Sequence, residues 1–212
     1  MAGYRLYWRP GSGSMVVEAA LRLIGADFEP IRIDKEAALA TPRFLALNPA
    51  GKVPVLELPS GQVIAESVAI LLALDETFPE ARLLPPHGSP ARNVAVQWLI
   101  FMTANIYADA LRLYYPSRHT DDAAPEAAEA IKRQAIIDLD RDFAQLATAI
   151  KGPFLLGARM TITDVYAAML ADWHAPAMRL PAIATLTAQV LENPAVAEAW
   201  RTHEFGGEAG TE

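Results

Sequence analysis

The chain has 212 residues, of which 52% are hydrophobic and 20% are charged, a composition that is typical of globular proteins and excludes a disordered chain. It contains no cysteine, which excludes disulfides, thiolate metal sites and a cysteine nucleophile. The four histidines show no HxxxH or HExxH spacing, so no metal site is expected. A formal net charge of −7 argues against nucleic acids and anionic membranes as main partners.

Two segments bear on the cellular compartment. The N-terminus carries no apolar stretch of signal-peptide length. The longest stretch without a charge, Asn93 to Ala108, is shorter than the ~20 residues that span a bilayer, and Gln97 and Asn105 interrupt it. We therefore interpret it as a buried helix and expect a soluble, cytoplasmic protein that does not use a membrane.

Strand and helix signals alternate through residues 1–80. Short runs of strand-forming or alternating apolar residues predict strands at Tyr4–Trp8, Phe28–Ile33, Val53–Leu58 and Gln62–Ala65. Apolar residues at helical spacing predict helices at Met15–Ile24, Thr41–Leu47 and Glu66–Phe78. The order β-α-β-α-β-β-α predicts an α/β domain whose first two strands are parallel and whose last two form an antiparallel hairpin.

A proline-rich segment follows this domain and predicts a linker over 81–90. After it, apolar periodicity predicts helices at Arg92–Tyr114, Glu126–Ile150, Thr161–Trp173, Pro181–Leu191 and Pro194–His203. No strand signal competes with them. Residues 91–212 are therefore expected to form an all-α helical bundle.

Val53-Pro54 stands at the start of the third predicted strand. Proline cannot donate to a sheet ladder, so a position at the first residue or the edge of a strand is one sufficient explanation. A cis peptide bond is the other. It would turn the N–H and C=O of Val53 outward, where they could pair with the backbone of a bound peptide.

Glu66-Ser67 marks the start of the helix after the fourth strand. Either side chain could simply cap the helix. Alternatively, the helix start binds a ligand carboxylate, Ser67 adds a hydroxyl donor and Glu66 accepts from an ammonium group. The pair could then hold the head group of an α-amino acid.

Pro10–Ser14 connects the first strand to the first helix and has three interpretations. It could be a turn that caps the helix, or a phosphate loop, although GxxxxGK[ST] is absent and GxGxxG does not fit. It could also present a hydroxyl at a helix N-terminus, where the helix dipole and the hydroxyl both stabilise a thiolate. A serine hydrolase is a weaker alternative, because GxSxG is absent.

Thr161 and Asp164 form a predicted capping box, which we interpret as structural. Together these features resemble the cytosolic glutathione transferases from about Tyr4 to His203. The run NPAGKVPVL at Asn48–Leu56, followed by IAES at Ile64–Ser67, carries most of the resemblance. It implies a glutathione transferase fold, with a thioredoxin-like N-terminal domain and an all-helical C-terminal domain.

The resemblance implies a set of residues for glutathione. The backbone of Val53 would pair with the cysteinyl backbone, with Pro54 cis. Glu66 and Ser67 would hold the γ-glutamyl head group, and Lys52 could meet the glycine carboxylate. Glutathione would act as a co-substrate without a metal.

The residue that stabilises the thiolate is implied by the first turn. Pro10-Gly11-Ser12 is similar to serine-using members of the family and implies Ser12. The run LYWRPGSGS also resembles the bacterial beta class, but Gly13 occupies the cysteine position and Ser14 follows it. That departure excludes a mixed disulfide there. We favour Ser12 over Ser14, with backbone N–H groups at the helix start as a third alternative.

The second substrate, a small hydrophobic electrophile, is expected between the Ser12 loop and the first helices of the second domain. Five residues are expected to line this pocket: Trp8, Asn105, Tyr107, Arg112 and Tyr115. Packing in the core or an interface is the alternative for the tyrosines. Arg112 with Tyr115 would suit an anionic or aromatic substrate.

The resemblance implies that the thiolate is conjugated to the electrophile, a detoxification reaction, in a homodimer. A glutathione-dependent isomerase, dehalogenase or peroxidase would share the same site and is the alternative. A non-catalytic binding or interaction protein is an alternative of another class. The presence of Pro54 and Ser67 argues against it.

Overall fold

The computed structural model describes residues 3–34 and 36–206, and its contacts divide the chain into two compact units. Residues 1–86 and 191–212 form the first unit, and residues 87–190 form the second. The sequence prediction placed the whole of 91–212 in the helical domain. In the structure the last helix, α10 (Pro194–Thr202), packs on α1 (Ser14–Leu23) and so belongs to the first unit.

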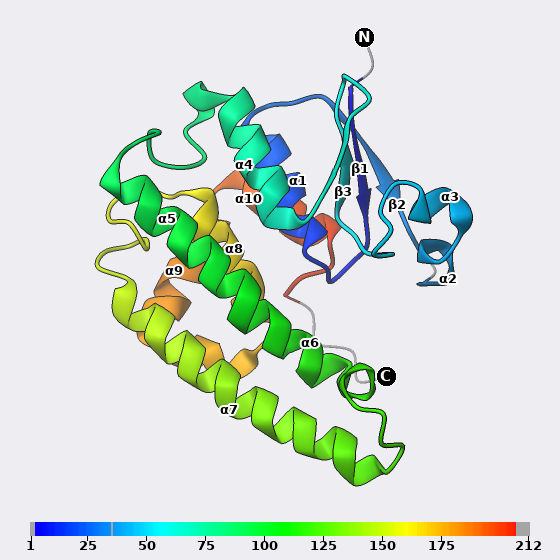
Figure 1. Cartoon of the computed structure of the whole chain (residues 1–212). Coiled ribbons are helices and arrows are strands. Elements are labelled where there is room, and N and C mark those ends of the chain that lie inside the picture. The colour runs from blue at the N-terminus through cyan, green and yellow to red at the C-terminus, as the bar shows by residue number, and fades with distance from the viewer. Residues whose placement is uncertain (1–2, 35, 207–212) are drawn as a thin grey trace. The chain divides into compact units, whose positions relative to one another are not determined.

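The first unit contains a four-stranded mixed sheet in the order β2-β1-β3-β4 (Figure 1). Its strands are β1 (Tyr4–Trp8), β2 (Phe28–Arg32), β3 (Val55–Glu57) and β4 (Val63–Ala65). β1 and β2 are parallel, while β3 is antiparallel to both β1 and β4. The predicted topology is confirmed, and Pro30 is tolerated because β2 is an edge strand.

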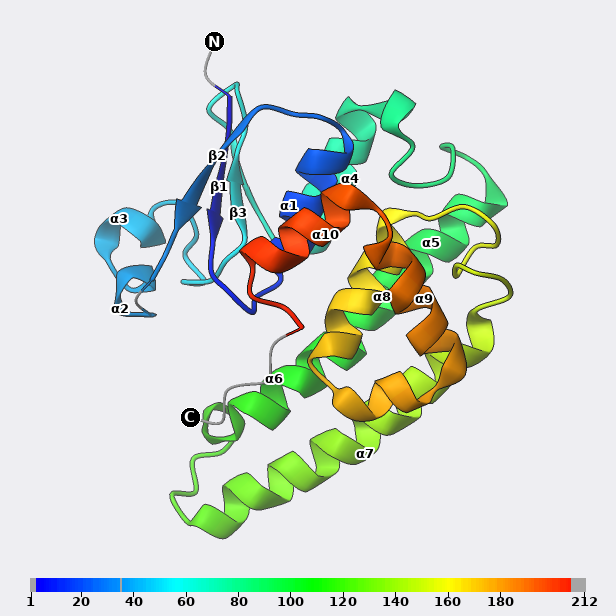
Figure 2. The same ribbon diagram turned by 180° about the vertical axis from the view of Figure 1, so that it is seen from behind.

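Helices cover both faces of this sheet. On one face lie α1, α10 and α4 (Ser67–Thr77), followed by the short η1 (Pro79–Ala81) (Figures 1 and 2). On the other face lie two short helices, α2 (Glu36–Leu39) and α3 (Pro42–Leu45), where the sequence predicted one. The hydroxyl of Thr41 accepts the Phe44 N–H and caps α3.

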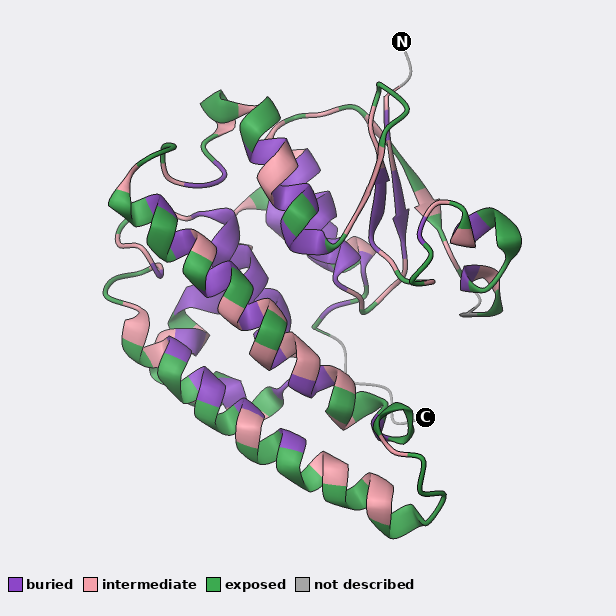
Figure 3. Cartoon of the chain, in the orientation of Figure 1, coloured by how far each residue is buried: buried purple, intermediate pink, exposed green. Residues whose placement is uncertain are grey.

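Because successive side chains of a strand point to opposite faces, the sheet contributes to a hydrophobic core on each of its two faces. Leu6 and Leu56 are fully buried at paired positions, while Tyr7 and Val55 pack with Phe44 on the face that α2 and α3 cover. Every residue of α1 from Ser14 to Leu21 is buried (Figure 3). Because α1 is packed on all sides, its position is fixed. The turn that leads into its first residue is therefore held in place at that end.

The second unit is helical, as predicted. Its elements are α5 (Pro90–Phe101), η2 (Met102–Tyr107), α6 (Ala108–Tyr114), η3 (Pro116–His119), α7 (Pro125–Ala149), α8 (Ile162–Asp172), η4 (Ala175–Arg179) and most of α9 (Pro181–Leu191). The first predicted helix is one continuous run, but η2 in its middle is a π-helix. Such segments are rare and occur frequently at functional sites.

The run Pro90–Tyr114 is 25 residues long and is apolar enough, by length and composition, to cross a membrane. The charge-free stretch Asn93 to Ala108 is only part of this run, which agrees with the helix predicted at Arg92–Tyr114. Buried core helices of soluble proteins meet the same criterion, and 39% of the most apolar window is buried here. Leu99, Met102 and Ile106 are fully buried, so we interpret the run as a core helix.

The predicted capping box at the start of α8 is confirmed. Asp164 accepts the Thr161 N–H at 2.7 Å and the Leu155 N–H at 2.7 Å. Burial raises the pKa of Asp164, although these hydrogen bonds oppose the shift. The residue therefore fixes the loop before α8 and has the structural role that the sequence indicated.

Candidate functional site

The pairing register of the sheet brings three separate segments to one end of it. Tyr7 near the end of β1 pairs with Val55 at the start of β3, and Val55 pairs with Ala65 at the end of β4. The Ser12 loop follows β1, Pro54 precedes β3 and Glu66 follows β4. The segments that were predicted to form a site, although far apart in the sequence, therefore adjoin the same end of the sheet.

The turn before β3 contains a cis peptide bond between Val53 and Pro54, as predicted. Pro54 is buried, Val53 is half-buried and the Lys52 side chain is exposed. In the part of the chain that the structure describes, the backbone N–H and C=O of Val53 make no backbone hydrogen bond within the protein. Both groups are available to a peptide ligand.

Asn48 holds this turn, a role that the sequence analysis did not assign to it. The side chain is buried; its Nδ2 donates to the Lys52 carbonyl at 2.8 Å and its Oδ1 accepts the Ala50 N–H at 3.1 Å. Gly51 has a φ of +61°, and a Cβ there would lie 3.3 Å from the Leu39 carbonyl oxygen. The signal was present, because asparagine before Pro-Ala-Gly is typical of an Asx turn.

Glu66 and Ser67 begin α4, but Glu66 does not cap it. Its side chain is exposed and makes no capping hydrogen bond, while its backbone has a φ of +68°. A positive φ costs a non-glycine residue about 1–3 kcal/mol and is concentrated at functional sites. Ser67 is buried at the first position of the helix, where backbone N–H groups lack helical acceptors. The arrangement is compatible with an anion-binding helix start.

Ser12, in the turn before α1, is hydrogen-bonded to Ser14, the first residue of α1. The Ser12 hydroxyl donates to the Arg9 carbonyl at 2.7 Å, and its oxygen lies 2.9 Å from Ser14 Oγ. Because a hydroxyl carries one proton, Ser14 supplies the proton of the second bond when Ser12 donates to Arg9. Ser14 is fully buried and Ser12 is half-buried, so only Ser12 faces solvent.

Backbone N–H groups at the same place are a second source of donors. The N–H groups of Ser12 and Gly13 have no acceptor among the described residues. The N–H of Ser14 donates to Ser12 Oγ at 3.3 Å. The turn and the helix start thus present two free amides, and the helix dipole adds a positive field.

Trp8 lies at the end of β1 and is buried in the first unit. Its ring centroid is 4.4 Å from that of His203, and the Arg32 guanidinium carbon lies 5.3 Å from the ring. Its Nε1 has no hydrogen-bond partner among the described side chains and backbone. Trp8 therefore directly precedes the Ser12 loop in the chain, and its ring packs against His203, which follows α10.

The other four predicted pocket residues lie on the η2–α6 run of the second unit. Tyr107 contacts Trp173 edge-on with a centroid distance of 5.0 Å, and Asn105 Nδ2 donates to the Phe101 carbonyl at 3.0 Å. Tyr115 is 44% exposed and its ring lies 4.1 Å from the Arg118 guanidinium carbon. The prediction that these residues share a pocket with Trp8 stays a prediction.

Arg112 is engaged by a buried carboxylate. It forms an ion pair with Asp109, which lies three residues earlier on α6. Burial raises the pKa of Asp109, the charge and hydrogen bond of Arg112 oppose this, and the charges of Asp138 and Asp142 add to the rise. The positive charge of Arg112 is therefore partly neutralised by Asp109.

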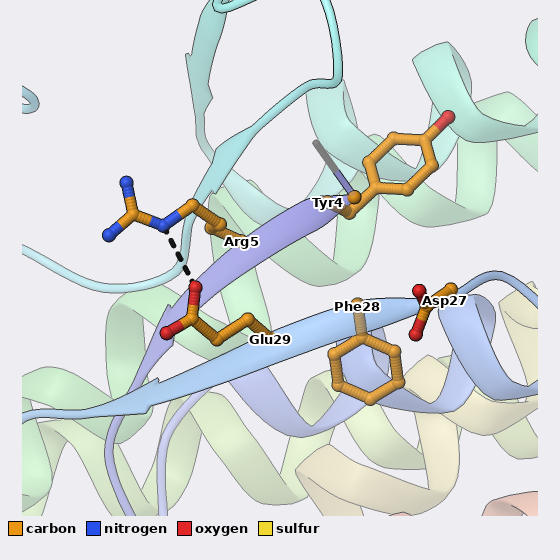
Figure 4. A pocket seen from close by; sticks show the side chains of 6 residues that line it. Tyr4, Arg5, Asp27, Phe28 and Glu29 are labelled. Atoms are coloured by element: carbon orange, nitrogen blue, oxygen red, sulfur yellow. Dashed lines mark hydrogen bonds and ion pairs between the residues drawn. The ribbon is translucent and has the colours of Figure 1, made fainter. Parts of the chain in front are cut away.

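A hollow of about 240 Å³ is present at the opposite end of the sheet. Its lining includes Tyr4, Asp27 and Phe28 at the beginning of β1 and β2, with an ion pair between Arg5 and Glu29 at its rim (Figure 4). The predicted site follows the C-terminal ends of β1 and β4 instead. The hollow and the predicted site are thus separate features of the first unit.

Comparisons with known proteins agree with this arrangement. The family profile described as "Glutathione S-transferase, N-terminal domain" matches residues 14–77. Glutathione S-transferase GstA of Escherichia coli O157:H7 is 28% identical over 202 residues, which cover 92% of this chain and 96% of the relative. A solved sphingomonad glutathione S-transferase in complex with glutathione is 28% identical, has a TM-score of 0.80 and aligns over 94% of this chain and 98% of its own. The chain has the glutathione transferase fold, and its residues 14–77 match the glutathione S-transferase N-terminal domain family.

The family profile spans α1 to α4 of the chain. It therefore includes Ser14 and all five residues predicted to bind glutathione: Lys52, Val53, Pro54, Glu66 and Ser67. A probable maleylacetoacetate isomerase of Caenorhabditis elegans is 43% identical over 79 residues, or 37% of this chain and 36% of the relative. No group of three or more potential metal ligands is present in residues 3–34 and 36–206.

Proposed function

We propose that the chain is a glutathione transferase that converts the glutathione thiol to a thiolate and conjugates it to a small apolar electrophile. The observation that carries the proposal is the row formed by Tyr7, Val55 and Ala65, which places three family motifs at one end of the sheet. The bound glutathione of the sphingomonad relative supports the choice of ligand.

Each part of glutathione finds chemically suitable groups there. The γ-glutamyl carboxylate is suited to the start of α4, where Ser67 adds a hydroxyl, and its ammonium group to the exposed carboxylate of Glu66. The unpaired backbone groups of Val53 can form two hydrogen bonds with the cysteinyl residue. Lys52 provides a cation for the glycine carboxylate, and its exposure permits this contact.

The thiol would then be directed to the start of α1. A free thiol has a pKa of about 8.5 and is largely protonated at neutral pH. A hydroxyl from Ser12 and the free amides of Ser12 and Gly13 would stabilise the anion and so lower that pKa. Ser12 must release the Arg9 carbonyl to donate to sulfur, and Ser14 remains as its buried neighbour.

The electrophile would contact aromatic residues of η2 and α6. Tyr107 of η2 and Tyr115, which directly follows α6, present ring surface, and Asn105 of η2 adds a polar group. Replacement of Tyr115 by alanine should raise KM for an aromatic electrophile several-fold and leave KM for glutathione unchanged. Ile137→Ala, at an exposed apolar position of α7, is the matched control. An equal effect of both variants would remove Tyr115 from the proposal.

Calorimetric titration with glutathione tests the proposed site. We expect a Kd between the micromolar and low millimolar range, weakened about tenfold, or ~1.4 kcal/mol, by Ser67→Ala. Ser89→Ala is the control, because Ser89 Oγ caps α5 in the second unit and the substitution should leave the affinity unchanged. Absence of binding at millimolar glutathione would leave the non-catalytic interaction protein as the remaining interpretation.

Glutathione-dependent isomerisation is a second candidate, favoured by the similarity to a maleylacetoacetate isomerase. In that reaction the thiolate adds to a conjugated double bond, the resulting single bond rotates, and elimination returns glutathione and the trans product. An NMR assay with a cis-enedione carboxylate separates the two functions. An isomerase leaves the glutathione concentration constant, whereas conjugation consumes one glutathione for each product.

The proposed oligomeric state, location and partners rest on the similarity to glutathione transferases. We expect a homodimer in the cytoplasm whose partners are glutathione and the electrophile. The net charge of −7 agrees with the absence of nucleic acid from this set. Sedimentation of the purified chain measures the oligomeric state directly.

A further inference from the structure

His203 connects the C-terminal segment to the core of the first unit. It directly follows α10 and is fully buried, as is Glu18 in the second turn of α1. His203 Nε2 lies 2.9 Å from Glu18 Oε2, and the imidazole packs against the Trp8 ring. The last helix, α10, packs on the first helix, α1 (Figure 2).

The backbone of the same residue contacts the turn before α1. The His203 carbonyl accepts the Gly11 N–H at 2.9 Å. Gly11 has a φ of +58°, so the turn depends on a conformation that few residues other than glycine adopt. One residue thus contacts the helix through its side chain and the turn through its carbonyl.

Glu18 receives donors from two sides. Its Oε1 accepts from Arg22 of α1 at 2.7 Å and 2.9 Å, and its Oε2 is bound by His203. Arg22 belongs to the same helix and cannot fix the position of that helix relative to the rest of the unit. Since a buried carboxylate oxygen is costly without a donor, the contact with His203 is a strong constraint on α1.

We propose that His203 is a positioning residue, which holds the Gly11–Ser14 turn and the start of α1 in the geometry that stabilises the glutathione thiolate. The inference rests on the proposed function. Thiolate stabilisation depends on short donor distances, so a small displacement of the turn reduces it strongly. The proposed glutathione contacts before β3 and at α4 lie on other segments, so we expect binding to change less than thiolate stabilisation.

Three replacements separate the contacts of the side chain. His203→Ala removes all of them, His203→Gln keeps a donor for Glu18, and His203→Phe keeps a ring against Trp8 without a donor. Arg201→Ala is the matched control, because Arg201 is exposed on the same helix and pairs only with Glu198 among the described residues. The Gln and Phe variants preserve volume and provide data if His203→Ala does not fold.

The pKa of bound glutathione, read from thiolate absorbance against pH, is the primary measurement. We expect His203→Ala to raise it by about one unit, so that the thiolate fraction at low pH falls about tenfold. The Kd for glutathione should change less than threefold, His203→Gln should restore most of the shift, and His203→Phe should restore little. An unchanged thiol pKa in His203→Ala, or an equal change in Arg201→Ala, would overturn the proposal.

Hydrogen exchange of the Gly11 amide distinguishes this proposal from the proposed function. We expect that amide to exchange at least about tenfold faster in His203→Ala than in the wild type, with or without glutathione. Unchanged protection would refute the clamp even if glutathione binds. If glutathione does not bind to the wild type, the function fails, while faster exchange still supports the clamp itself.

Discussion

The oxygen of Ser12, in the turn before α1, lies 2.9 Å from that of Ser14, the first residue of α1, and the Ser12 hydroxyl donates to the Arg9 carbonyl. The two hydroxyls form a short chain of hydrogen bonds that ends at the Arg9 carbonyl. Only Ser12 reaches solvent, because Ser14 is fully buried. Their roles are therefore expected to differ, although the sequence presents them as near equivalents.

Ser12→Ala should lower kcat/KM for conjugation about tenfold or more and raise the pKa of bound glutathione. Ser14→Ala should lower the free energy of unfolding by about 1 kcal/mol and affect kcat/KM less. Steady-state kinetics and urea denaturation of both variants provide the comparison. A larger kinetic loss in Ser14→Ala would reverse the assignment, and wild-type kinetics in both would leave the backbone amides as the stabilising groups.

Asn48→Ala should disorder the turn that carries Lys52 and Val53. It removes two buried hydrogen bonds and leaves the Lys52 carbonyl unpaired, at a cost of about 1–3 kcal/mol of stability. We expect KM for glutathione to rise about tenfold, with a smaller change in kcat. Ser89→Ala, which loses only the α5 cap, should reduce stability by about 1 kcal/mol without this KM effect. A wild-type KM in Asn48→Ala would show that the turn forms without its anchor.

Glu18→Gln should remove an acid-dependent component of stability. Burial raises the pKa of Glu18, but the hydrogen bonds and charges of His203 and Arg22 outweigh this and place it below its ordinary value. The folded state therefore binds fewer protons than the unfolded state just below pH ~4.3, and stability falls as pH falls. The difference in unfolding free energy between wild type and variant should shrink on acidification. Glu192→Gln, at an exposed position between α9 and α10, serves as the control.

Asp109→Asn should reveal the opposite dependence. The pKa of Asp109 is raised by burial and by the charges of Asp138 and Asp142, against the effect of Arg112. The folded state thus binds more protons than the unfolded state just above pH ~3.9, so this residue adds stability as pH falls. Urea denaturation at several pH values should show that the unfolding free energy of the wild type increases relative to that of Asp109→Asn as the pH falls. A pH-independent difference would contradict the raised pKa.

The proposed glutathione site could be assembled from the sequence because its determinants are local. Val53-Pro54 and Glu66-Ser67 adjoin strands whose positions follow from alternating side chains, and the order of elements determines which strand ends meet. Asn48 belongs to the same motif, yet its anchoring role required the turn to be seen. Four of the five predicted pocket residues were expected near the C-terminal end of one helix, but the π segment of that helix has no periodic signal that distinguishes it from an α-helix.

The cis bond before Pro54 was indicated only by the resemblance to glutathione transferases. The sequence by itself determined the order of strands and helices, the mixed sheet and the capping box at Thr161 and Asp164. Each depends on residues close together in the chain or on alternation along one strand. Only the tertiary structure decided that α10 joins the first unit, that His203 reaches Glu18 across 185 positions, and that Glu66 leaves its helix uncapped. Such contacts are selected by burial and by the pairing of buried polar groups, and no local pattern specifies which distant partner is chosen.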